Sequence, residues 1–168
     1  ILVNPTKAFA QNLDASTSAT IEKIQYELPY SGLLPDNPLY FLKAIRDNIL
    51  KFLISNPLKK AQFDLLQADK RLGSAQLLLA KGKAELSITT LSKSGNYFDD
   101  AIANIQKAQK EGDDVNATLD QLLKSSQKHQ EVILQMEKGQ RGDTLLSLKF
   151  LEQRAKDFQE RVLIIKSQ

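Results

Sequence analysis

The chain has 168 residues, 42% of them apolar and 26% charged, a composition that suits one globular domain with a substantial core. It contains no cysteine, which excludes disulfides, thiolate metal sites and cysteine nucleophiles. No apolar run reaches the roughly 18 residues of a membrane span. Residues 37–83 carry nine Lys and Arg against three Asp, but no nucleic-acid-binding motif accompanies this charge of +6. We therefore expect no nucleic-acid partner.

Residues 1–36 form a predicted N-terminal arm that ends in a turn-rich segment, and residues 37–168 form a predicted helical body. Ala8-Phe9-Ala10 fits a small-x-small signal-peptidase site, with Pro5 just upstream. This pattern predicts export to the periplasm, the cell surface or the medium. The sequence leaves open whether residues 1–10 stay in the mature protein. Chain ends are usually ordered only when something holds them. We therefore expect the apolar side chains of the arm to dock on the chain's own bundle or on a neighbouring copy: Ile1, Leu2, Val3 and Phe9.

Asn37-Pro38-Leu39 predicts the start of a shorter helix, with Asn37 as N-cap and Pro38 at the first helical position. The same device at Asn56-Pro57-Leu58 ends that helix and begins a longer one. Glycines then separate four long helices of about 25 residues, each ~37 Å in length. The predicted breaks fall at Gly82, Gly112, Gly139 and Gly142.

Apolar residues recur at alternating steps of three and four along each long helix. The helix after Pro57 shows this seam in Leu58, Ala61, Leu65, Ala68, Leu72, Ala75 and Leu79. Such a pattern, with short turns, predicts an all-α fold, an antiparallel up-down bundle of four long helices. The shorter helix carries the same spacing, so we expect it to cover one end or one groove of the bundle through Leu42, Ile45, Ile49 and Phe52.

His129 is the single histidine of the chain and falls on an apolar seam. A helical-bundle carboxylate site for metal would require Glu-x-x-His on two helices, which the sequence lacks. Gly95 and His129 lie equally far from the turn at Gly112, one on each side. We therefore predict a polar layer in the core, in which the imidazole fills the space above Gly95, with Ser126 and Asn96 as its partners.

Other patterns that carry chemistry are missing from the sequence. It contains no phosphate-binding loop, dinucleotide fingerprint, calcium loop or Ser-His-Asp signature. Its acidic pairs, Asp99-Asp100 and Asp113-Asp114, suit solvated helix faces and helix starts. We expect no catalytic residue, metal, cofactor or small-molecule substrate.

Residues 34–43, Leu-Pro-Asp-Asn-Pro-Leu-Tyr-Phe-Leu-Lys, resemble the L-P-D-(S/N)-P-L-Y-x-L-K motif of a bacterial family of unknown function. Residues 68–72, Ala-Asp-Lys-Arg-Leu, fit that family's second element, A-x-x-R-L. The resemblance implies an exported or membrane-anchored helical domain, in some members fused to anti-sigma-factor-like proteins. It assigns no catalytic residue. We interpret the motif as a structural clasp, with Leu39, Tyr40 and Leu42 inserted into the bundle and three residues fixing its entry: Pro35, Asn37 and Pro38.

These observations favour a non-enzymatic, exported structural or self-assembling subunit, a cell-surface or filament component that assembles through its N-terminal arm. Its partner would be a second copy, in a homo-oligomer, or another protein. The resemblance to the bacterial family alone suggests a second hypothesis, an envelope sensory or regulatory module that binds proteins. A bundle that binds a ligand or catalyses a reaction is the third, and a large polar cavity around His129 would support it.

Overall fold

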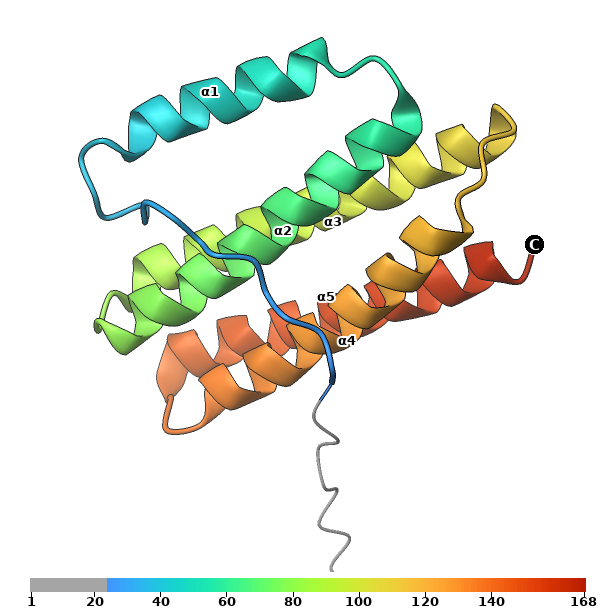
Figure 1. Ribbon diagram of the computed structural model, residues 1–168. Helices are drawn as coiled ribbons and strands as arrows, with labels where there is room; N and C mark the ends of the chain where they lie inside the picture. Colours follow the sequence, from blue (N-terminus) through green and yellow to red (C-terminus); the bar gives the residue numbers. More distant parts are fainter. Residues whose placement is uncertain (1–23) are drawn as a thin grey trace, which may run out of the picture.

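The computed structural model describes residues 24–168, and every regular element in this part of the chain is an α-helix (Figure 1). A short helix comes first and four long ones follow. Their bounds are α1 Tyr40–Leu53, α2 Pro57–Ala80, α3 Ala84–Lys110, α4 Asn116–Glu137 and α5 Gly142–Lys166. The predicted all-α bundle is therefore confirmed. None of these helices combines the length and apolar character needed to cross a membrane.

The four long helices form two hairpins that pack against each other (Figure 1). Within the hairpins α2 lies along α3, and α4 lies along α5. Between them α2 contacts α4 and α3 contacts α5, so α3 and α4 occupy diagonal positions although they follow each other in the chain. The connection at 111–115 therefore crosses the end of the bundle.

Caps and glycines set the ends of the helices much as the sequence predicts. The Asn56 side chain accepts a hydrogen bond from the Lys59 backbone, and Pro57 opens α2. Gly82 and Gly112 end helices with positive φ values of 74° and 89°, which glycine adopts without strain. The start of α1 differs from the prediction. The Asn37 side chain accepts a hydrogen bond from Leu39 in a local turn, so the helix begins at Tyr40.

The predicted apolar seams supply the core. One cluster centres on Phe98, which stacks on Phe158 with ring centroids 4.6 Å apart. A second cluster fills the other half of the bundle and contains Leu72, Leu91, Ile133, Leu148 and Leu151. Burial of these side chains is the main stabilising contribution to the fold.

Residues 24–39, which we call the strap, cross α4 and α2 before they reach α1 (Figure 1). The backbone N–H of Ile24 donates to Glu131 on α4 at 3.1 Å. Ser31 lies so close to Gly73 on α2 that a Cβ there would come within 2.6 Å of the hydroxyl oxygen. At the far end, Asp36 pairs with Lys81 and Lys83 at the α2–α3 turn. Polar contacts thus hold both ends of the strap, and its middle lies directly against α2.

Candidate interaction surface

Helix α1 turns its apolar face away from the bundle. The large apolar side chains of α1, together with Leu39 just before it, keep 43–86% of their surface exposed: Leu39, Phe41, Leu42, Ile45, Ile49, Leu50, Phe52 and Leu53. The prediction that Leu42, Ile45, Ile49 and Phe52 cover a groove of the bundle is therefore wrong. Exposed apolar patches of this size are uncommon on monomeric proteins and are typical of interaction sites, which makes this face the candidate surface.

The face of α1 that meets the bundle is polar. Lys43, Asp47 and Lys51 follow one another at intervals of four residues, so they lie on one side of the helix. Asp47 is only 2% exposed although it is charged. Because polar groups occupy the buried side, the apolar stripe is left on the opposite side.

Lys51 ties the end of α1 to the bundle. Its ammonium group lies 2.7 Å from Asp64 on α2 and 2.6 Å from Asp100 on α3, and 4.8 Å from the centre of the Tyr97 ring. Asp64 is completely buried and also accepts a hydrogen bond from Asn104. Burial raises the pKa of Asp64, and Lys51 partly offsets this. The buried carboxylate thus provides a specific reason for a lysine at this position.

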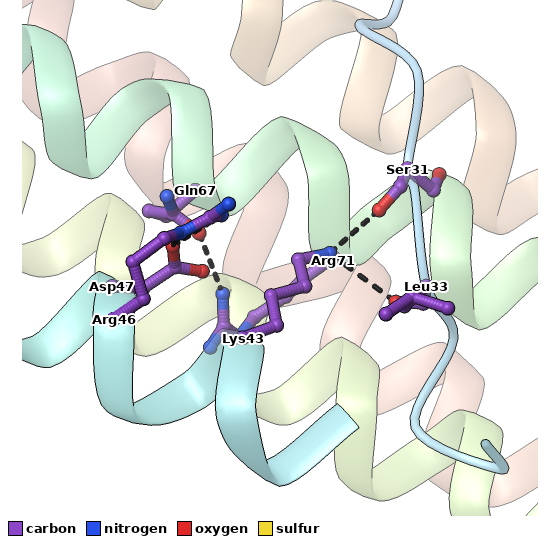
Figure 2. A network of polar contacts seen from close by, with 7 residues as sticks. All are labelled: Ser31, Leu33, Lys43, Arg46, Asp47, Gln67 and Arg71. Carbon is purple, nitrogen blue, oxygen red and sulfur yellow. Dashed lines mark hydrogen bonds and ion pairs between the residues drawn. The ribbon is translucent and has the colours of Figure 1, made fainter. Parts of the chain in front are cut away.

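Lys43 ties the start of α1 to the strap (Figure 2). Its ammonium group donates to the carbonyl oxygens of Ser31 at 2.6 Å and Leu33 at 3.2 Å. Partial burial lowers the pKa of Lys43, while the nearby Asp47 acts in the opposite direction. One turn further along α1, Arg46 donates two hydrogen bonds to Asp47.

A second polar cluster lies inside the bundle, around Asp69 of α2. One carboxylate oxygen of Asp69 accepts from Ser125 at 2.6 Å and lies 3.0 Å from Nε2 of His129. The other accepts from the hydroxyl of Tyr26 at 2.5 Å. Burial and the Asp69 carboxylate strongly raise the pKa of that hydroxyl, which stays protonated as a donor. The cluster thus fastens the strap to a buried carboxylate.

This cluster combines serine, histidine and aspartate without the contacts that activate a nucleophile. In a hydrolase triad the serine hydroxyl contacts the histidine, and the aspartate orients the histidine. Here Ser125 and His129 both bind Asp69. The cavity beside His129 and Gly95 has a volume of about 10 Å³, about the space of one water molecule. This geometry supports a structural role.

A wider groove of about 520 Å³ lies beside the strap and includes Tyr26, Gln62, Asp69, Gln121 and Lys124 in its lining. The carboxylate of Asp69 is already bonded to three side chains of the chain itself. Among residues 24–168 no group of His, Asp and Glu is arranged to hold a metal ion.

The predicted polar layer has different partners from those expected. His129 and Ser126 are buried, but the guanidinium of Arg154 occupies the space above Gly95, 2.7 Å from where a Cβ would lie. Asn96 bonds to Arg154, and Ser126 bonds to the backbone of its own helix. The imidazole of His129 contacts Asp69 because its helix, α4, lies next to α2, whereas α3 lies diagonally opposite α4. The prediction that His129 fills the glycine gap is therefore wrong.

The other predicted site residues have separate outcomes. The proposed assembly arm, Ile1, Leu2, Val3 and Phe9, lies outside the described residues. In the predicted clasp, Leu39 and Leu42 are each 55% exposed, so the prediction that they insert into the bundle is wrong. The residue that fastens this stretch is Asp36, whose pKa is lowered by hydrogen bonds from Lys83 and Lys81. Pro35, Asn37 and Tyr40 are partly buried around it, and Pro38 is exposed.

Sequence reasoning missed the residues that hold α1 and the strap in place. Asp64 and Asp69 each adjoin a seam residue, Leu65 and Ala68, and a charge beside a seam is a usable signal for a buried polar contact. The second signal was the four-residue spacing of charged groups on α1.

The fold is thus a four-helix bundle to which a strap fastens a fifth helix with its apolar side outward. The chain belongs to the family described as a domain of unknown function, DUF5667, whose model matches residues 32–150. That span includes the end of the strap, α1 and most of the bundle. Neither a curated protein nor a solved structure shows significant similarity to the chain.

Proposed function

We propose that this protein is a non-enzymatic, exported helical bundle that acts by binding protein through the outward face of α1. The observation that carries the proposal is the orientation of α1, whose apolar side chains point away from the bundle while Asp47 is buried against it and Lys51 reaches the buried Asp64. A helix-in-groove or helix-on-helix contact uses a stripe of this kind.

The polar clusters support a binding role over a catalytic one. The buried carboxylates Asp64 and Asp69 are already bonded to lysine, asparagine, serine, histidine or tyrosine of the same chain. Each therefore has a structural task, the first for α1 and the second for the strap.

A second candidate is an envelope sensory or regulatory module of the kind implied by the bacterial motif at residues 34–43. The strap favours it, because it links α4, α2 and α1 by polar contacts. Loss of these contacts would alter how α1 is presented. Both candidates share the same surface, and they differ in whether the partner is structural or part of a signalling pathway.

The test replaces Ile45 and Ile49 by Gln in the organism that makes the protein. Both residues are more than half exposed, so folding should be unaffected. We expect this allele to reproduce the phenotype of a gene deletion at an unchanged protein level. The matched control is Leu146→Gln with Phe150→Gln, two exposed apolar residues on α5. If the α1 allele behaves like wild type, the proposed function is wrong.

A further inference from the structure

We propose that the partner of the α1 face is a second copy of this chain, packed α1 against α1 in an antiparallel pair around a two-fold axis. This inference rests on the proposed function, because it names the occupant of the same surface. It follows from the spacing of the exposed side chains, the area they offer and the distribution of charge around them.

The exposed stripe of α1 has the spacing of a helix-pairing seam. Leu42, Ile45, Ile49 and Phe52 are separated by three, four and three residues, and all are more than half exposed. A two-fold axis midway between Ile45 and Ile49 brings each of them opposite the other in the second copy. The same axis brings Leu42 opposite Phe52, so the stripe complements itself.

The area of this face matches what a stable dimer needs. Its eight large apolar side chains are 43–86% exposed. At roughly 200 Å² for a large side chain, these exposures together offer on the order of 900 Å². A standard protein–protein interface buries about 800 Å² on each partner.

The charges of α1 favour a protein partner over a lipid surface. A helix that lies on a membrane uses lysines and arginines at its margins to contact head groups. Lys43 is bound to the strap, and Lys51 is bound to Asp64 and Asp100. Arg46 is paired with Asp47. The two lysines of this helix are therefore engaged within the chain, Arg46 is paired although its side chain is 62% exposed, and the centre of the outward face is apolar.

The first experiment measures the mass of the full chain in solution by sedimentation velocity over a range of concentrations. We expect a reversible dimer for the wild type. Ile45→Gln with Ile49→Gln should weaken dimerisation at least about tenfold, because polar groups replace the centre of the seam. Leu146→Gln with Phe150→Gln on α5 should leave dimerisation unchanged, and circular dichroism should show native helix content for both variants.

The second experiment uses disulfides to determine the orientation, which is possible because the chain has no cysteine of its own. In the antiparallel pair, positions 42 and 52 of different copies lie opposite each other, whereas two copies of position 42 are about 15 Å apart along the helix axis. Mixing Leu42→Cys with Phe52→Cys should therefore give an oxidised heterodimer. Leu42→Cys alone should give little cross-linking.

Three results would overturn this inference. A monomer at all concentrations would exclude self-association, yet the proposed function would stand if the in vivo allele still failed, and the partner would then be another protein. Efficient cross-linking of Leu42→Cys to itself would show a parallel pair. Binding of a monomeric chain to vesicles of anionic phospholipid, lost in the α1 variant, would show that the occupant is a lipid surface.

Discussion

The bundle of α2 to α5 and the helix α1 have the same kind of amphipathic pattern but use it in opposite ways. In the bundle the apolar seam points inward, and residues such as Phe98 are fully buried. In α1 the apolar stripe points outward, and Asp47 and Lys51 face the bundle. The difference teaches that apolar periodicity predicts that a helix has an apolar face. Whether that face is buried depends on the side chains of the elements against which the helix packs. The buried Asp64 on α2 is the partner that attracts the polar side of α1.

The largest contrast should appear between two phenylalanines. Phe98 is fully buried between Phe158 and His129, whereas Phe52 is 86% exposed. Phe98→Ala should lower the free energy of unfolding by about 3–5 kcal/mol because it leaves a cavity. Phe52→Ala should change it by less than about 0.5 kcal/mol when measured by urea denaturation of the monomer. Equal losses would show that α1 packs on the bundle through its apolar face.

Removal of the buried carboxylate inside the bundle should have the next largest effect. Asp69→Ala leaves Ser125, His129 and Tyr26 without their partner, which should cost about 3 kcal/mol of unfolding free energy. Tyr26→Phe should cost about 1 kcal/mol in the wild type and less in the Asp69→Ala background. Additive losses in this double-mutant cycle would contradict the coupling of the strap to Asp69.

The contact between α1 and the bundle should be broken more selectively by Lys51→Met. This change leaves Asp64 buried without its cation, at a cost of about 2 kcal/mol. Hydrogen exchange should rise in α1 and remain low in α3. Lys59→Met, at an exposed lysine of α2, is the matched control and should have little effect. Similar exchange in both variants would mean that Lys51 does not hold α1.

The smallest effect should come from an ion pair on the bundle surface, read through its pH dependence. Partial burial opposes ionisation of Asp99, but hydrogen bonds from Arg161 and Arg154 lower its pKa overall. A carboxyl group with a lowered pKa stabilises the fold above its unfolded pKa of about 3.9, and this contribution is lost as the pH falls through the folded pKa. Asp99→Asn should therefore destabilise by less than about 1 kcal/mol at pH 6, and by less still near pH 3, in thermal unfolding. A stability difference between wild type and Asp99→Asn that grows as the pH falls would contradict this prediction.

Much of the bundle could be predicted from the sequence because its signals are local. The bounds of the long helices are predicted closely by Asn56-Pro57, by the glycines at the turns and by the apolar seams. The neighbours of each helix could not be predicted, because seam spacing is the same for adjacent and diagonal helices. For this reason the sequence pairs His129 with Gly95 on α3, whereas the structure places its imidazole against Asp69 on α2.

The candidate interaction surface was harder to predict for a related reason. The outward stripe on α1 and the inward seams are identical as patterns, so Leu42 and Ile45 gave no sign that they face solvent. The distinguishing signal was on the other side of the helix, where Lys43, Asp47 and Lys51 need partners. Those partners include Asp64 and a backbone carbonyl of Ser31, which are brought near only by the fold.

The strap has a consequence for the order in which the chain acquires its structure. The α2–α3 and α4–α5 hairpins join segments that are close in sequence, so each can form quickly as synthesis proceeds. Ile24, in contrast, bonds to Glu131, 107 positions later. We expect pulsed hydrogen exchange during refolding to show the Ile24 amide protected after those of α2 and α3. A segment that leaves the ribosome early is thus among the last to settle, and until then α1 is tethered to the nascent bundle without its final anchor.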